Sequence, residues 1–151
     1  MHKYLSISVK IFILVALEII IISSEFRPNL KQTPIGAGLY VNYFAFGSNM
    51  KSSVLETRRR IDLQRNMGPA LLENHKLVFN VGGVPFVEPS FASVDVSKDH
   101  EVHGLLVSMN WRSFMRLARS EGFPFSYQLY PVRVQPYGTD QIVSALTFRS
   151  Q

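Results

Sequence analysis

The clearest pattern of apolar and polar positions in the chain begins at Leu39. Aromatic and branched residues dominate positions 39–46, which is typical of a buried β-strand, and Gly47-Ser48-Asn49 then predicts a tight loop. Ser53 and Glu56 follow with the spacing of a capping box, in which a hydroxyl and a carboxylate satisfy backbone N–H groups at a helix start. The pattern therefore predicts a strand, a short polar loop and a helix in succession.

Four short apolar runs in the middle of the chain predict β-structure. The first two surround a polar turn at residues 73–75. The other two flank residues 97–100, whose turn-forming and charged side chains predict a hairpin. The four runs are residues 70–72, 76–81, 91–96 and 102–109.

A second helix is predicted after Asn110, which is a favoured N-cap residue. Its apolar side chains recur at helical spacing, and Gly122 predicts its end. Alternating residues 130–134 and the run 142–148 predict two further strands. Because strands and helices do not alternate regularly, we expect an α+β domain. The predicted apolar face of the helix consists of Trp111, Phe114, Met115 and Ala118.

The beginning of the chain differs from the rest. Residues 11–22 form an apolar run with Lys3 and Lys10 before it and polar residues after it, which is typical of a secretory signal peptide or a signal anchor. The run is shorter than the ~20 residues of a membrane-spanning helix, and Glu18 near its middle disfavours insertion. An additional strand or helix packed on the domain is the other interpretation. Residues 11–22 are therefore the candidate membrane contact.

Prolines and glycines mark the start of the folded domain. They interrupt any periodic pattern between residues 28 and 38, where the other residues are mostly polar, and this predicts a linker. We therefore assign residues 1–38 to a hydrophobic signal-like or anchor-like segment with its linker. Residues 39–151 are assigned to one domain.

Composition limits the classes of protein that remain. The chain has 151 residues, 46% of them hydrophobic, which is enough for the core of one domain. It has no cysteine, so disulfides, thiolate nucleophiles and cysteine-ligated metals are excluded. The formal net charge is +5. A nucleic-acid-binding module would use Arg58, Arg59, Arg60 and Arg65, although charge runs of this kind usually lie on solvated helix faces.

The polar residues also argue against several kinds of catalytic site. The four histidines, at positions 2, 75, 100 and 103, lack the spacing of metal ligands. Gly47-Ser48-Asn49 lacks the lysine of a phosphate-binding loop and the second glycine of a nucleophile elbow. We therefore predict no metal site, and neither an NTPase nor an α/β-hydrolase.

Two features remain as candidate chemistry. The polar loop at residues 47–49 lies between a buried strand and a helix, where successive backbone N–H groups can converge on an anion. The alternative is that these residues form an ordinary turn without a binding role. Glu121 stands beside Gly122 at the predicted helix end, where a solvated glutamate is the common explanation. The residues alone leave both alternatives open.

The stretch Tyr43-Phe44-Ala45-Phe46-Gly47-Ser48-Asn49-Met50 resembles the signature of the γ-glutamylcyclotransferase family. Residues 102–107 resemble that family's central strand, and residues 117–122 resemble the helix end that carries its catalytic glutamate. Tyr127 and residues 132–134 continue the likeness, which extends over about residues 43–148. The resemblance implies an α+β fold with a mixed, β-barrel-like sheet and flanking helices.

The resemblance also implies a reaction and a site. The substrate's α-amine would attack its own γ-amide carbonyl, giving 5-oxoproline and a free amine without any cofactor, as in glutathione metabolism. Glu121 would be the catalytic residue that transfers the protons. The substrate-binding residues would be Tyr43, Phe44, Ala45, Phe46, Gly47, Ser48, Asn49, Met50 and Tyr127.

Two departures from the family keep alternatives open. Phe46 stands where the family commonly has tyrosine, and the chain ends at Gln151, before a segment found in family members, so we expect a domain shortened at its C-terminus. The leading interpretation is an enzyme acting on a small-molecule γ-glutamyl substrate. A binding protein without turnover is the first alternative, and a basic nucleic-acid module is the second. The leaving group, the oligomeric state and the choice between a cytoplasmic and a membrane or secretory location stay open.

Overall fold

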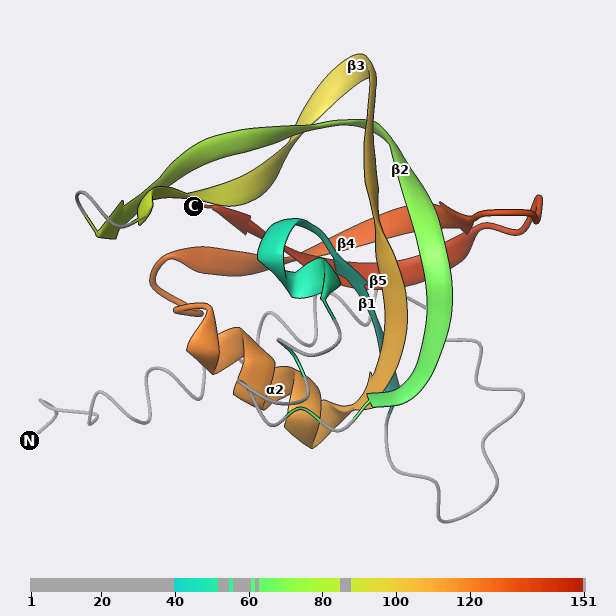
Figure 1. Ribbon diagram of the computed structural model, residues 1–151, viewed down its shortest axis with the longest axis horizontal. Coiled ribbons are helices and arrows are strands. Elements are labelled where there is room, and N and C mark those ends of the chain that lie inside the picture. The colour runs from blue at the N-terminus through green and yellow to red at the C-terminus, as the bar shows by residue number, and fades with distance from the viewer. Residues whose placement is uncertain (1–39, 52–54, 56–60, 62, 85–87, 151) are drawn as a thin grey trace, which may run out of the picture. The chain divides into compact units, whose positions relative to one another are not determined.

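The computed structural model describes residues 40–51, 55, 61, 63–84 and 88–150, and these residues are mostly in β-strands. Five strands form a closed barrel in the order β1-β3-β2-β4-β5 (Figure 1). The described elements are β1 (Tyr40–Ala45), the 3-10 helix η2 (Gly47–Met50), β2 (Leu63–Val84), β3 (Glu88–Asn110), α2 (Trp111–Ser120), β4 (Tyr127–Pro136) and β5 (Val143–Ser150). The predicted α+β class and barrel-like sheet are confirmed, with α2 as the single α-helix of the described residues.

Some predictions fall on residues outside the described part of the chain. They include the signal-like segment at residues 11–22 and the capping box of Ser53 and Glu56. The described residues include no helix with the length and hydropathy that crossing a membrane requires. The boundary at residue 38 and the candidate membrane contact therefore stay predictions.

β1 confirms the strand predicted over residues 39–46, and its alternating side chains contact two different groups of residues. Phe44 is fully buried in the barrel core with Leu72, Leu106 and Val134. Tyr43 packs on the other side of the strand, with its ring centroid 6.1 Å from Phe114 of α2. Because β-strand side chains alternate between faces, one short strand connects the barrel core to the helix.

Gly104 of β3 makes the close packing of β1 possible. A Cβ atom at this position would lie 2.5 Å from both the Phe44 ring and the Ala45 carbonyl oxygen. Gly104 therefore leaves room for a buried aromatic ring directly against the neighbouring strand, which is a common reason for glycine inside a sheet.

The structure corrects the turns predicted at residues 73–75 and 97–100. Both segments lie inside long continuous strands, which run side by side and bend together (Figure 1). The pairing shifts from Glu73 opposite Glu101 to His75 opposite Val96. Asn74 (φ 56°) and Asp99 (φ 62°) adopt left-handed backbone conformations, which short polar side chains tolerate. The polar residues thus produce a bulge and a bend in a paired ribbon, and no chain reversal occurs there.

The second predicted helix and the last two strands are confirmed. The Asn110 side chain caps α2 by accepting a hydrogen bond from the Ser113 N–H at 2.8 Å. The buried face of α2 is formed by Ser113, Phe114, Leu117 and Ala118, with the predicted Trp111 and Met115 only half-buried. The face is turned toward Leu117 because the helix packs its i, i+3 and i+4 positions against the sheet.

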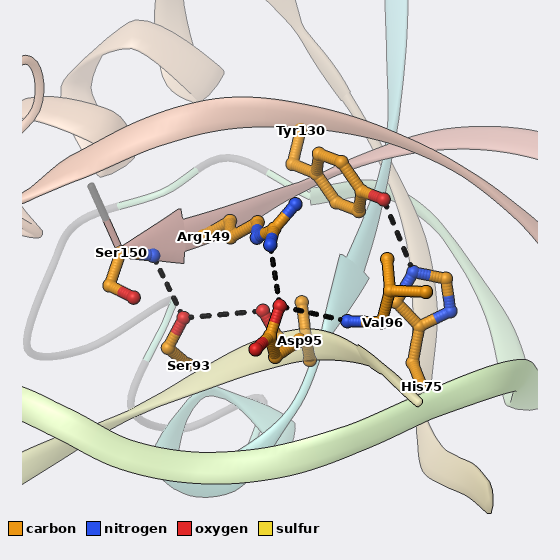
Figure 2. A network of polar contacts seen from close by, with 8 residues as sticks. His75, Ser93, Asp95, Val96, Tyr130, Arg149 and Ser150 are labelled. Carbon is orange, nitrogen blue, oxygen red and sulfur yellow. Dashed lines mark hydrogen bonds and ion pairs between the residues drawn. The ribbon is translucent and has the colours of Figure 1, made fainter. Parts of the chain in front are cut away.

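Side chains also connect β5 with β3, two strands that are not neighbours in the barrel. Arg149 forms an ion pair with Asp95 and lies over the Tyr130 ring, 5.1 Å from its centroid. The Ser150 N–H donates to the Ser93 hydroxyl at 2.8 Å. Figure 2 shows these five residues, which we call the seam network; Tyr130 comes from β4 and the other four from β3 and β5.

Candidate active site

The loop after β1 turns sharply because of one glycine. Gly47 has φ 59°, a left-handed conformation that costs glycine little and other residues more. The Asn49 N–H then donates to the Phe46 carbonyl oxygen at 3.3 Å and closes the turn of η2. This turn leaves Gly47 and Ser48 exposed and directs Asn49 into the protein, where its side chain is 8% exposed.

Glu121 is placed by the way α2 ends. The Phe123 N–H donates to the Ala118 carbonyl at 3.0 Å and the Gly122 N–H donates to the Arg119 carbonyl at 3.1 Å. With Gly122 at φ 90°, this is a Schellman motif, the common glycine-dependent helix end. Glu121 occupies the C-cap, so the same glycine that ends the helix determines where the carboxylate lies.

The loop and the helix end meet through a buried amide. The Asn49 Nδ2 group donates to the Glu121 carboxylate at 2.8 Å and to the Tyr43 hydroxyl at 3.1 Å. An ionised carboxylate only accepts hydrogen bonds, so the amide nitrogen must face Glu121. The contact joins residues 72 positions apart and fixes the half-buried glutamate against the loop.

The carbonyl oxygen of the Asn49 side-chain amide can still accept a hydrogen bond. The Asn49 Oδ1 atom is buried and has no hydrogen-bond partner within the part of the chain that the structure describes. Leaving a buried acceptor unpaired costs about 1–3 kcal/mol. Such a cost at a pocket wall is consistent with an acceptor kept for a ligand that donates a hydrogen bond.

These residues border a pocket of about 140 Å³. The Tyr127 hydroxyl donates to the Ala92 carbonyl oxygen at 2.7 Å, which holds the start of β4 against β3 beside the pocket. The lining includes an amide, a carboxylate, hydroxyls and several aromatic rings, and therefore suits a small ligand with both polar and apolar parts. The lining residues are Tyr43, Phe46, Gly47, Ser48, Asn49, Phe79, Ala92, Glu121, Tyr127 and Phe148.

The structure brings seven of the ten site residues named in the sequence analysis to this pocket. Phe44 and Ala45 lie fully buried in the interior, and Met50 is exposed without lining the pocket. Sequence reasoning missed Phe79, Ala92 and Phe148, which come from three different strands. The alternation of apolar and polar residues could identify these three positions as parts of strands. Only the pairing register of strands that are distant in the sequence brings them to the pocket. The seven residues at the pocket are Tyr43, Phe46, Gly47, Ser48, Asn49, Glu121 and Tyr127.

Three of the four arginines of the nucleic-acid alternative cannot be located in the structure. Arg58, Arg59 and Arg60 lie outside the described residues, and Arg65 is exposed on β2. A contiguous basic surface is the minimum requirement for the nucleic-acid alternative. That alternative therefore stays an untested prediction.

Comparison with known proteins agrees with the resemblance seen in the sequence. No protein-family model matches the chain. The γ-glutamyl cyclotransferase gliK of Aspergillus fumigatus is 36% identical in an alignment 104 residues long, with coverage of 56% of this chain and 37% of the relative. The γ-glutamyl cyclotransferase verK of Clonostachys rogersoniana is 30% identical in an alignment 112 residues long, with coverage of 63% of this chain and 60% of the relative. Both relatives therefore carry the name of the family suspected from the sequence.

Solved structures show which fold the chain shares. A γ-glutamyl cyclotransferase superimposes with a TM-score of 0.65 at 22% identity, covering 75% of this chain and 68% of that one. The chain therefore has the γ-glutamylcyclotransferase-like fold. An AIG2-like protein of Mus musculus superimposes with a TM-score of 0.54 at 14% identity, covering 74% of this chain and 77% of that one. At these identities the structural likeness shows the fold alone.

The coverage limits what can be transferred from the relatives. The chain spans 37% of the length of the first curated relative and 60% of the second. Both relatives and the first solved structure are named γ-glutamyl cyclotransferase. The substrate and the individual reaction are matters for a proposal.

Proposed function

We propose that this chain catalyses the intramolecular cyclisation of γ-glutamyl amides to 5-oxoproline. The α-amine nitrogen of the substrate forms a bond to its own γ-carbonyl carbon, and the amide bond to the leaving amine breaks. Two protons move in total from the α-ammonium nitrogen, which becomes the lactam N–H, to the departing nitrogen, which leaves as an ammonium group, so the reaction balances without a co-reactant. Since the nucleophile is part of the substrate, holding the chain in a folded conformation supplies much of the rate enhancement.

The observation that carries the proposal is the 2.8 Å hydrogen bond between Asn49 and Glu121. It joins the loop that would hold the substrate to the carboxylate that would move the proton. Glu121 would accept a proton from the α-ammonium group and return one to the leaving amine, as a general base and then a general acid. The pocket at about 140 Å³ is of a size for the γ-glutamyl group.

The loop supplies the groups that would bind the substrate's charges. The backbone N–H groups of the exposed residues Gly47 and Ser48 would donate to the α-carboxylate or to the oxygen that develops negative charge at the γ-carbonyl. The unpaired Asn49 Oδ1 would accept a hydrogen bond from the α-ammonium group. Phe46 has no hydroxyl, so the function proposed for this loop relies on backbone groups and on Asn49.

The proposal is tested by incubating the full chain with γ-glutamyl dipeptides, γ-glutamyl-lysine and glutathione and detecting 5-oxoproline by mass spectrometry. We expect product from the unmodified protein and none above background from Glu121→Gln, which keeps the shape of the side chain and removes its basicity. Glu101→Gln, an exposed glutamate on β3 that does not line the pocket, is the matched control and is expected to keep turnover.

The outcomes separate the proposal from its alternative. Product from Glu121→Gln at the unmodified rate would contradict the role of Glu121. If no substrate on the panel gives product while a γ-glutamyl dipeptide raises the melting temperature, the chain is a binding protein of this family instead.

A further inference from the structure

The pocket encloses too little space for a whole γ-glutamyl amide. Sites that enclose a drug-sized ligand measure roughly 300–1,000 Å³, whereas this pocket measures about 140 Å³. Its inner wall is made of buried side chains, with Tyr43 only 1% exposed and Tyr127 and Phe148 also buried. If the γ-glutamyl group occupies this inner part, the leaving amine must extend through the opening.

The opening is marked by the pocket residues that are exposed to solvent. They are Gly47 and Ser48 of the loop and Phe79 of β2, whose side chain is 67% exposed. Phe79 pairs across the sheet with Ala92, whose small side chain cannot cover the aromatic ring. A Cβ placed on Gly47 would lie 3.8 Å from the Ala92 Cβ, so this part of the β2–β3 ribbon lies directly beside the loop.

The charges around the opening also restrict the leaving group. Glu121 is the one charged side chain among the described residues that line the pocket, and no lysine or arginine is among them. A leaving group with a carboxylate therefore meets no compensating cation among the described lining residues. An exposed aromatic ring beside such a site is favourable for an apolar or aromatic group, which it can stack against.

We propose that Phe79 determines substrate specificity by binding an apolar, ring-bearing leaving amine at the mouth of the pocket. This inference rests on the proposed cyclotransferase function. It narrows the substrate class to γ-glutamyl amides whose amine carries an aromatic or other bulky apolar group. Phe79 itself takes no part in the proton transfers, because it lies at the mouth and has no titratable group.

The test compares two substrates that differ by one phenyl group, γ-glutamyl-benzylamide and γ-glutamyl-methylamide. The kinetics of 5-oxoproline formation are measured for the full unmodified chain, for Phe79→Ala and for Phe79→Tyr. Leu77→Ala is the matched control, since Leu77 lies two residues earlier on the same strand, is also exposed and does not line the pocket. γ-Glutamyl-glutamate, whose leaving group is acidic, is expected to be the poorest substrate.

We expect the unmodified chain to prefer the benzylamide by about tenfold in kcat/KM. In Phe79→Ala this preference falls by about three- to tenfold, the range for loss of one aromatic contact, through a higher KM for the benzylamide. The methylamide is processed equally well by both proteins. Phe79→Tyr and Leu77→Ala keep the preference.

The remaining outcomes contradict either the specificity role of Phe79 or the proposed cyclotransferase function. If the unmodified chain forms product from both amides without a preference, or if Phe79→Ala keeps the preference, the specificity role is wrong and the cyclotransferase function stands. If the unmodified chain forms no product from either amide or from the wider panel, the proposed function fails and the specificity role fails with it.

Discussion

The pocket and the seam network are two polar regions built on the same long strand, β3, and they differ in their exposure to water. At the pocket, the Asn49 amide is buried and binds both Glu121 and Tyr43, and its Oδ1 has no partner among the described residues. At the seam, the charged side chains are partly exposed, 31% for Arg149 and 44% for Asp95. Water screens the seam charges, whereas it is largely excluded from the amide. Polar contacts of similar length therefore differ between the two regions in how much they contribute to the free energy of folding.

The largest expected effect follows from replacing the buried amide. Asn49→Leu keeps the approximate shape of the side chain but removes the hydrogen bond that positions Glu121, while the backbone N–H of the loop remains. We expect kcat to fall by about 100-fold, since displacement of a catalytic group by about 1 Å has this effect, and KM to rise because the proposed contact of Asn49 Oδ1 with the substrate is lost. Steady-state kinetics on the best γ-glutamyl substrate measures both constants.

Asn42→Leu is the control for that experiment. The Asn42 side chain also donates a hydrogen bond, to the Ser144 carbonyl at 3.2 Å, but it lies away from the pocket. It is expected to keep kcat. Equal losses of kcat in the two variants would mean that the effect of Asn49 is a general one on the fold.

The next effect concerns a buried hydroxyl of the seam. Ser93 is fully buried and accepts the hydrogen bond of the Ser150 N–H. Ser93→Ala leaves that partly buried donor without its partner, so we expect a loss of about 1–3 kcal/mol in the free energy of unfolding. Urea denaturation measures it, with Ser97→Ala, at a half-buried position in the bend of β3, expected to change stability by less than about 0.5 kcal/mol. Identical midpoints for the two variants would contradict this account.

A third variant affects the pocket wall. Tyr127→Phe removes the hydrogen bond to the Ala92 carbonyl, which should lower the free energy of unfolding by about 1 kcal/mol and also lower kcat/KM. Tyr130→Phe, which removes a longer 3.3 Å contact with His75 at the seam, is the matched comparison. We expect it to affect turnover less than Tyr127→Phe does. A larger loss of kcat/KM in Tyr130→Phe would reverse the roles assigned to the two regions.

The smallest expected effect is that of the seam ion pair. A double-mutant cycle with Asp95→Asn and Arg149→Gln should give a coupling free energy of about 0.2–1 kcal/mol that decreases with added salt. Turnover should be unchanged in all three variants. A salt-independent coupling of several kcal/mol would show that the pair is shielded from water in solution.

The local elements were predictable because their signals are local. The strand before Gly47 and the helix between Asn110 and Gly122 are specified by alternation, by an N-cap and by a glycine stop, all within a few residues of each other. The long ribbon of β2 and β3 was not predictable in the same way. A polar segment with Asn74 or Asp99 has the same composition in a turn and in a bulge, and only the pairing partner decides between them.

By itself the sequence determined the β1 strand with its glycine loop, the length of α2 and the position of Glu121 at its end. The barrel closure, the contact of Asn49 with Glu121 and the placement of Phe79, Ala92 and Phe148 at one pocket were decided by the tertiary structure. The physical reason is the separation along the chain of the residues that interact. Caps, turns and alternation depend on neighbouring residues, whereas a site assembled from a loop, a helix end and three strands depends on the register of segments far apart in the chain.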